Sequence, residues 1–200
     1  MSKDAIKPVA IVGHPVLRQK AEAVELTDEV LDLCDTMLNM MYEFDGIGLA
    51  GPQVAESKRV VVLDLQIKFS DEQFAQLSEG EKKLIPLMPI ALINPEVSVL
   101  PSEKTTADEG CLSIPDIYGP VTRSEKCLLK STVISFETGD DIDVEIECSG
   151  LLSRCLQHEI DHLDGLLFID RMALPDKVKL NSKITKLKRK YKKTGYLKSK

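Results

Sequence analysis

Hydrophobic residues recur at helical intervals between residues 28 and 44. The apolar positions there are Val30, Leu31, Cys34, Met37, Leu38, Met41 and Phe44. This period predicts an amphipathic helix, with Thr27 at its N-cap and Gly46 as its terminating glycine. Two short apolar runs, residues 60–63 and 90–93, predict buried strands. The polar residues 66–88 between them predict a long excursion that is partly helical.

A second hydrophobic pattern lies further along the chain. Residues 126–136 and 142–148 predict two strands, joined as a hairpin at residues 139–141. Ser149 then predicts the N-cap of a helix that runs to Gly165. The polar residues that share an arc of about 100° on this helix are Ser153, Arg154, Gln157, Asp161 and Asp164. The rest is apolar except for two histidines and a glutamate, which predicts a central, buried helix. Strands before a late helix, without βαβ alternation, predict an α+β fold whose mostly antiparallel sheets pack around it.

Charge divides the 200-residue chain into two parts. Residues 176–200 hold eleven Lys or Arg and one acid, so this segment has a net charge of +10. Since the whole chain has a net charge of −6, residues 1–175 have a net charge of −16. We therefore expect a folded domain over residues 1–175 and a basic C-terminal helix or tail over residues 176–200. Such a tail is suited to a polyanionic partner.

Composition narrows the setting of the protein. Residues 1–8 lack the apolar run of a signal peptide, and nowhere do 18 apolar residues follow one another, so no membrane span is expected. The five cysteines are odd in number and lack paired spacing. This usage favours a reduced, cytoplasmic protein over a disulfide framework.

The segment from His158 to His162 fits the pattern H-E-x-x-H. Residues four apart on a helix lie about 40° apart around its axis and about 6 Å along it. Both imidazoles can therefore reach one metal ion at about 2.0–2.1 Å. Glu159 points about 100° away from His158 and can exchange protons with a metal-bound water. Because buried imidazoles and carboxylates are costly without partners, the pattern favours a metal-dependent hydrolase over a chance match of core residues.

The third metal ligand decides the class of site. Phe168 stands where a metzincin needs its last histidine, and no glutamate follows Glu159 to complete a thermolysin-like site. His14 precedes a proline near the N-terminus and is expected in a surface turn. The downstream residues that remain formal alternatives are Asp164, Asp170 and Asp176. An upstream carboxylate or a cysteine is favoured.

Among the cysteines, Cys111 is the preferred ligand, since the compact segment 109–115 is bounded by glycine and proline. Cys155 competes, because it lies three residues before His158. Three ligands from adjacent turns of one helix would be strained around a tetrahedral ion, so we expect Cys155 in the pocket wall. The cysteines within periodic segments, expected to be small core residues, are Cys34, Cys127 and Cys148.

Three motifs, in this order along the chain, resemble those of the peptide deformylases, which remove the N-formyl group from newly made proteins. They are Gly46-Ile47-Gly48-Leu49-Ala50-Gly51-Pro52-Gln53, Glu109-Gly110-Cys111-Leu112-Ser113 and Gln157-His158-Glu159-Ile160-Asp161-His162. The stretch from residue 14 to residue 171 is similar to the whole family domain. A triple match is far more specific than H-E-x-x-H alone.

The resemblance implies roles for individual residues. The implied ligands of one divalent metal ion are Cys111, His158 and His162. Fe(II) is the native ion of the family, and Zn, Ni or Co can replace it; a thiolate with two imidazoles discriminates poorly among them. Glu159 is the implied general acid/base in the attack of a metal-bound water on the formyl carbon. The side-chain amide of Gln53 and the backbone N–H of Leu112 are the implied oxyanion donors, each worth about 3–4 kcal/mol of barrier.

The substrate site follows from the same resemblance. Gly46 and Gly48 let an extended substrate backbone approach and pair as an added strand, although Gly46 alone would fit an ordinary helix-terminating loop. The residues implied to line the pocket for the methionine side chain are Ile47, Leu151 and Cys155. The expected substrates are nascent formyl-methionyl polypeptides.

The chain departs from the family pattern at three places. Gly51 replaces the usual alanine, and we expect its backbone freedom to loosen the placement of Gln53 only modestly at most. Residues 116–121 differ from the commonest pattern and are expected to reshape the rim of the substrate cleft. The excursion at residues 66–88 is longer than in compact members, and no function is assigned to it.

The basic segment from Asp176 onward repeats lysine at near-helical intervals, with Val178, Ile184 and Leu187 on a partial apolar stripe. The resemblance implies contact with ribosomal RNA near the exit of the nascent chain, with affinity that falls steeply as salt rises. A solvated basic helix without a partner is the alternative.

Two other functions compete with deformylation. A metallopeptidase that cleaves internal peptide bonds would share H-E-x-x-H, but no third His or Glu ligand is identified for it. A ribosome-binding or RNA-binding protein with a vestigial site would explain the basic segment, but every inferred catalytic position is intact. Both are less well supported than a formyl-peptide amidase.

Overall fold

The computed structural model describes residues 8–197. The first seven residues, where no signal peptide is expected, and the last three of the basic segment lie outside the described residues. The strands are β1 (Val9–Ala10), β2 (Gly48–Ala50), β3 (Val60–Leu63), β4 (Ile90–Val99), β5 (Lys104–Glu109), β6 (Gly119–Ser124), β7 (Lys126–Ser135), β8 (Asp141–Ser149) and β9 (Tyr196–Leu197). The helices are α1 (Asp28–Glu43), α2 (Asp71–Ala75), α3 (Glu79–Leu84), α4 (Gly150–Leu163), α5 (Phe168–Arg171) and α6 (Leu174–Tyr191). Short 3₁₀ turns span Pro15–Arg18, Gly51–Val54 and Ile85–Leu87.

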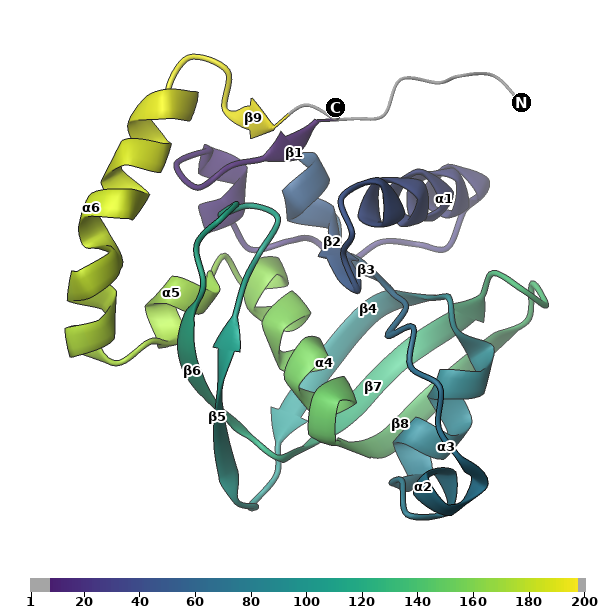
Figure 1. Ribbon diagram of the computed structural model, residues 1–200. Coiled ribbons are helices and arrows are strands. Elements are labelled where there is room, and N and C mark those ends of the chain that lie inside the picture. Colours follow the sequence, from purple (N-terminus) through teal and green to yellow (C-terminus); the bar gives the residue numbers. More distant parts are fainter. Residues whose placement is uncertain (1–7, 198–200) are drawn as a thin grey trace.

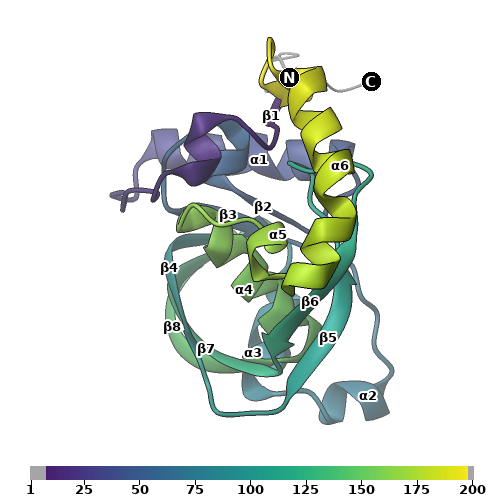
Figure 2. The ribbon, with the colours of Figure 1, turned by 90° about the vertical axis from the view of Figure 1, so that its left-hand side faces the viewer.

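A curved five-stranded sheet with the order β2-β3-β4-β7-β8 forms the largest layer (Figure 1). All of its neighbouring strands are antiparallel. Helix α4 lies in the concave side of this sheet, and the β5–β6 hairpin covers α4 from the other side (Figure 2). The arrangement confirms the predicted α+β class with antiparallel sheets around a central helix.

Alternation along the central strands builds two hydrophobic clusters. Val61 and Leu63 of β3 belong to the cluster that contains the apolar residues of α4. Val60 and Val62 belong to the cluster formed with α1. Because successive side chains of a strand point to opposite faces, the apolar run packs helices on both faces of the sheet. The predicted strands at residues 60–63 and 90–93 are confirmed, and β4 continues to Val99.

Helix α4 is buried along most of its length, and only Leu151 in its first turn is exposed. Its apolar side packs on the sheet. The arc of polar residues is buried as well: Ser153 is 0%, Gln157 8% and Asp161 5% exposed. These side chains face β6, where Gln157 donates to the carbonyl of Ser124 at 2.8 Å. The helix bounds and the burial predicted from the sequence are thus confirmed.

The excursion between β3 and β4 contacts the residue that precedes α4. It contains α2, α3 and a 3₁₀ turn, as the partly helical prediction required. Glu81 on α3 is 7% exposed and accepts hydrogen bonds from the hydroxyls of Ser78, at 2.8 Å, and Ser149, at 2.6 Å. Ser149 does occupy the N-cap position of α4, but its hydroxyl makes no capping bond. The excursion therefore anchors the first turn of α4.

Both ends of α1 lie close to the predicted residues, but the bonds and backbone conformations there differ from the prediction. Thr27 is at the N-cap but makes no side-chain capping bond, and the residue with left-handed backbone is Asp45, at φ 56°, rather than Gly46. The N–H of Gly46 reaches the carbonyl of Met41 at 2.8 Å, and that of Asp45 reaches Tyr42 at 3.1 Å. This pair of bonds closes the helix as a Schellman motif.

The C-terminal helix packs on the domain through Ile184 and Leu187 of the predicted stripe, but not through Val178. Ile184 is buried, and Leu180, Leu187 and Tyr191 pack around it in a cluster that includes Phe168. Val178, expected in that stripe, is 64% exposed, because it lies on the opposite side of the helix from Leu180. Beyond α6, β9 pairs with β1. The division of the chain at residue 175 stays a prediction, and α6 itself begins at Leu174.

The structure adds strands that the hydrophobic pattern did not predict, namely β1, β2, β5, β6 and β9. Strand β5 is exposed at every residue except Glu109, so it has no apolar alternation to reveal it. Within residues 8–197, no helix combines the length and the apolar character needed to cross a bilayer.

Candidate metal centre

Cys111, His158 and His162 come together between the β5–β6 hairpin and α4. One ligand atom from each lies within 4.8 Å of the other two, and Cys111 Sγ is 3.2 Å from His162 Nε2. Bonds of about 2.0–2.3 Å to a shared ion bring ligand atoms to such separations. Within residues 8–197, this is the only group of three or more His, Cys, Asp or Glu side chains so arranged.

The other ligand candidates lie elsewhere. Cys155 lines a cavity beside the centre, and burial raises the pKa of its thiol well above the ordinary value, so the reactive thiolate is disfavoured there. His14 begins the turn at Pro15–Arg18, where its Nδ1 accepts from the N–H of Val16 at 3.3 Å. The aspartates that do not join the cluster are Asp164, Asp170 and Asp176. The cysteines that are buried core residues, as predicted, are Cys34, Cys127 and Cys148.

A buried carboxylate orients one of the histidines. Glu109, the last residue of β5, lies 2.9 Å from His158 Nδ1, which leaves Nε2 of that ring to face Cys111. Burial opposes the charge of Glu109, but hydrogen bonds with His158 and Arg123 lower its pKa to about 2. A carboxylate behind a ligating histidine fixes its tautomer and ring orientation. The sequence motif contains Glu109, yet no role was predicted for it.

Arg123 joins this carboxylate to α4. Its guanidinium is 4% exposed, donates to Glu109 at 2.6 Å and to Asp161 at 2.8 Å. Arg171 donates to Asp161 at 2.6 Å, and Arg154 to Glu109 at 2.7 Å. Buried charges of this kind are tolerated only when each one is paired, because an unpaired buried charge strongly destabilises the fold. Arg123 was not predicted, since nothing in the local pattern marked residues 119–124 as a strand with an inward arginine.

Glu159 faces the centre from the next position of α4. It is 5% exposed, and burial raises its pKa to about 7. Gly48 lies against it: a Cβ there would come 2.5 Å from Glu159 Oε1. Glu159 Oε2 and His162 Nδ1 are buried without a hydrogen-bond partner among the described residues. A cluster of thiol and imidazoles with such an unpaired carboxylate fits a metal ion and a water better than a closed core.

Two hydrogen-bond donors belong to residues that line the cavity beside the cluster. Gln53 is 2% exposed, and its Oε1 accepts from the N–H of Ala50 at 2.8 Å. This bond turns Nε2 toward Cys111 Sγ and Ser113 Oγ, both at 3.5 Å. The backbone N–H of Leu112 has no acceptor within residues 8–197. The N–H of Leu112 is therefore available to a ligand, whereas Nε2 of Gln53 makes two long hydrogen bonds.

Gly51 is closely packed, and the modest loosening of Gln53 expected from its backbone freedom stays a prediction. It is buried, and a Cβ at this position would collide with the carbonyl oxygen of Lys58. Its own carbonyl accepts from the N–H of Glu56 at 3.0 Å. The absence of a side chain at Gly51 thus permits close packing against the backbone of residues 56–58.

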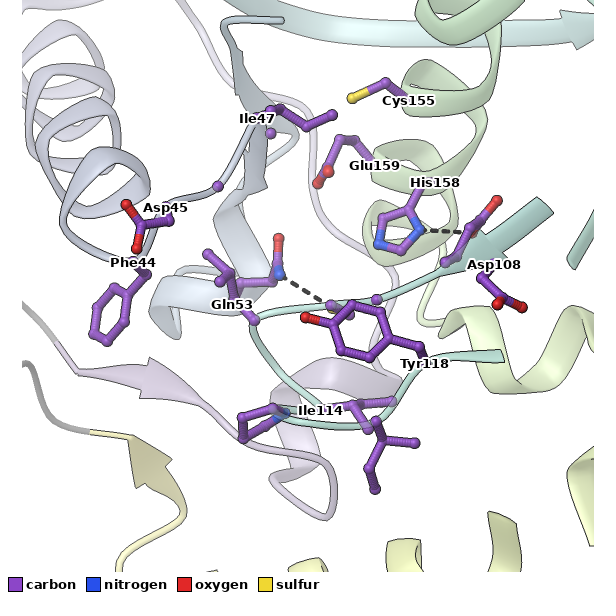
Figure 3. Close-up of a pocket in the computed structure, with 18 of the residues that line it drawn as sticks. Phe44, Asp45, Ile47, Gln53, Asp108, Ile114, Tyr118, Cys155, His158 and Glu159 are labelled. Carbon is purple, nitrogen blue, oxygen red and sulfur yellow. Dashed lines mark hydrogen bonds and ion pairs between the residues drawn. The ribbon is translucent and has the colours of Figure 1, made fainter. Parts of the chain in front are cut away.

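A cavity of about 560 Å³ opens beside the cluster (Figure 3). The residues predicted to bind substrate all line it: Gly46, Ile47, Gly48, Leu151 and Cys155. Gln53, Cys111, Leu112, His158 and Glu159 contribute to the same wall. Tyr118, from the segment that departs from the family pattern, stands at its mouth with 66% of its surface exposed.

Comparison with known proteins agrees with this geometry. A sequence model of the family described as polypeptide deformylase matches residues 6–178. The chain belongs to the peptide deformylase family. A peptide deformylase of Agrobacterium fabrum is 40% identical over 185 residues, covering 92% of this chain and 97% of that protein. One from Desulfitobacterium hafniense is 43% identical over 168 residues, covering 84% and 95%.

Solved peptide deformylases share the fold. The Plasmodium falciparum enzyme superimposes with a TM-score of 0.75 at 32% identity and covers 93% of this chain and 98% of its own. The Synechococcus elongatus enzyme, solved in complex with actinonin, gives a TM-score of 0.72 at 34% identity, covering 93% and 88%. The protein is thus a hydrolase of a metal-dependent family whose reaction is removal of the formyl group from N-terminal formyl-methionine.

Proposed function

We propose that Cys111, His158 and His162 hold one divalent metal ion, Fe(II) in the cell, with Zn, Ni or Co as substitutes, and that Glu159 is the general acid/base of deformylation. The observation that carries this proposal is the cluster of three ligand atoms within 4.8 Å, beside a buried carboxylate oxygen with no partner among the described residues. When bound, the ion supplies Lewis-acid chemistry that activates water and polarises the formyl carbonyl.

The roles of the other groups follow from their positions. Glu159 takes a proton from the attacking water and returns it to the leaving amine, and its pKa of about 7 suits both transfers. Nε2 of Gln53 and the N–H of Leu112 donate to the oxygen that gains charge as the formyl carbon becomes tetrahedral. Because Ala50 holds Gln53 from behind, its donor needs no reorganisation during the reaction.

The cavity selects the substrate. Ile47, Leu151 and Cys155 are its apolar wall for the methionine side chain, which is long and flexible enough to fill an irregular pocket. Gly46 and Gly48 leave the edge of the 46–48 segment open to an extended peptide. The absence of a Cβ at Gly48 also makes room for Glu159, so this glycine serves the catalytic carboxylate as well as the substrate.

Formate release from formyl-Met-Ala-Ser by anaerobically purified protein, paired with metal analysis, tests the function. We expect formate in proportion to bound metal, loss of both after chelation, and recovery on adding Fe(II). Cys111→Ser should weaken metal retention and release less formate. Cleavage of unformylated Met-Ala-Ser alone would instead indicate the metallopeptidase alternative.

We also propose that the enzyme works in the cytoplasm on nascent chains, docked on the ribosome near the exit of the nascent chain through α6 and residues 192–193. A separate cavity of about 450 Å³ supports this, because it is lined by Lys188, Arg189, Lys192 and Lys193. Basic side chains around one hollow suit RNA phosphates. Lys192→Glu with Lys193→Glu should abolish co-sedimentation with ribosomes at low salt while formate release persists; unchanged binding would contradict the proposal.

A further inference from the structure

The segment proposed to pair with the substrate backbone, residues 46–48, has little side-chain surface with which to pack. Gly46 and Gly48 have no side chains, and Ile47 between them is 38% exposed. Glycine leaves the backbone unusually free to adopt other conformations. Figure 3 shows Ile47 at the wall of the cavity and Asp45 just before the segment. The path of this segment along the cavity therefore depends on hydrogen bonds to neighbouring elements.

Two parts of the fold hold the segment, one at each end. At its start, the N–H of Gly46 donates to the carbonyl of Met41, in the last turn of α1, at 2.8 Å. At its end, the carbonyl of Ile47 accepts from the N–H of Asp64, directly after β3, at 3.0 Å. The placement of the segment thus depends on where the end of α1 lies relative to Asp64.

One side-chain hydrogen bond joins these two anchors directly. The hydroxyl of Tyr42, also in the last turn of α1, donates to Oδ2 of Asp64 at 2.6 Å. A distance this short is typical of a hydroxyl bonded to a carboxylate. Burial and the hydrogen bond with Asp64 raise the pKa of Tyr42 above its ordinary value, so the phenol keeps its proton. Oδ1 of Asp64 accepts from the N–H of Gln66 at 3.0 Å, which fixes the orientation of the carboxylate.

We propose that Tyr42 and Asp64 are positioning residues for substrate binding, and that their hydrogen bond holds residues 46–48 in the path along which the substrate backbone pairs. The inference rests on the proposed function, because that function assigns the substrate to this segment. Neither side chain is among the described residues that line the cavity, so both act through the backbone of Ile47. A segment that is ordered before the substrate arrives loses less conformational freedom on binding. The bond should therefore lower KM without changing the chemical step.

Kinetics of formate release by the metal-loaded, full-length Tyr42→Phe variant test this role. Because Tyr42 is 40% exposed, loss of its hydroxyl opens no cavity in the core. For formyl-Met-Ala-Ser we expect KM to rise about fivefold, as for one lost hydrogen bond, and kcat to stay within about twofold, since the reacting groups are untouched. For formyl-methionine amide, which has no further backbone to pair with the segment, KM should rise about twofold or less. Tyr196→Phe, the matched control, removes the same hydroxyl from a ring that packs on His14 and should leave both constants unchanged.

Substitutions of Asp64 show whether the two side chains act as a pair. Asp64→Ala should raise KM about as much as Tyr42→Phe does. The double variant should raise it no further, because the effects of two residues that share one hydrogen bond are not additive. Asp64→Asn should keep KM near that of the unchanged protein, since its amide can still bond both the phenol and the N–H of Gln66.

The outcomes separate the positioning role from the proposed function. An unchanged KM in Tyr42→Phe, a loss of kcat in place of a rise in KM, or effects of Tyr42→Phe and Asp64→Ala that simply add would each overturn the positioning role. A lower free energy of unfolding with KM unchanged would show that the bond only stabilises the fold. All of these results would leave the deformylase function intact, because the unchanged protein still releases formate. If the unchanged protein released none from either substrate, the proposed function would fall, and the positioning role with it.

Discussion

On one side of α4, Asp161 accepts from Arg123 and Arg171, and Gln157 donates to the carbonyl of Ser124. On the other side, Glu159 Oε2 and His162 Nδ1 are as deeply buried but have no partner within residues 8–197. The two sides belong to the same 14-residue helix and are both rich in polar atoms. They differ in whether the fold itself satisfies those atoms.

The paired polar atoms of α4 stabilise the fold, whereas the unpaired ones are available for the reaction. A buried polar group without a partner costs about 1–3 kcal/mol, and a fold retains it where a ligand or a reaction completes it. The paired side holds α4 between the sheet and the β5–β6 hairpin. The unpaired side keeps its capacity for a metal ion, a water and a proton. Substitutions on the two sides should therefore affect different measurements.

The largest effect is expected from Glu159→Gln on the unpaired side. It removes the group that carries the proton, so kcat for formate release should fall about 10²–10⁴-fold. Because Oε2 has no partner to lose, metal content and the free energy of unfolding should stay near those of the unchanged protein. A variant that lost metal or stability instead would show that Glu159 belongs to the structural side.

Arg123→Met should have the opposite outcome. It leaves the carboxylates of Glu109 and Asp161 buried without their shared cation, and breaking such a pair costs about 3–5 kcal/mol. Urea unfolding measures this loss. The matched control is Lys126→Met, which breaks an exposed pair with Glu147, the two side chains being 47% and 44% exposed; it should cost about 1 kcal/mol or less. If both variants lost the same free energy of unfolding, the buried network would be no more important for stability than an exposed ion pair.

Glu109→Gln tests the point where the two sides meet, since Glu109 contacts both Arg123 and His158. The neutral amide orients the imidazole less firmly, and metal affinity should fall about 10–100-fold. Competition with a chelator measures the dissociation constant. Glu103→Gln, in the exposed segment before β5, should leave metal affinity unaltered; an equal loss there would point to a general charge effect.

The smallest effect concerns an ion pair near the end of α4. Burial opposes the charge of Asp170, but hydrogen bonds from Arg18 and the N–H of Leu167 lower its pKa below the ordinary 3.8. A lowered pKa stabilises the fold above about pH 4, and this contribution is lost as pH falls through the folded value. Asp170→Asn should remove this pH-dependent contribution to the free energy of unfolding. The contribution should be less than about 1 kcal/mol, since Arg18 is 44% exposed. Unfolding measured from pH 3 to pH 6 checks this, and an unchanged slope would contradict it.

Periodicity predicted the elements whose own residues define a buried face. Helices α1 and α4, strand β3 and the β7–β8 hairpin all carry dense apolar patterns. Strand β5 does not, because it is polar and largely exposed. Its neighbour β6 alternates Val121 and Arg123 inward, but an arginine there indicates burial only once its partners are known. The network behind His158 was missed for this reason.

The sequence by itself determined the pair of histidines and the glutamate on α4, because residues four apart on a helix share a face whatever surrounds it. It also determined that this helix is buried. Helical spacing could not supply the third side chain: Cys111 was preferred from its own segment and from the family resemblance, and only the fold brings its Sγ within 3.2 Å of His162, 51 residues away in the sequence. Only the fold decided which polar atoms of α4 are paired, since Arg123 reaches Asp161 through the β5–β6 hairpin. Helical spacing is local, whereas burial and pairing depend on segments that meet only in the folded chain.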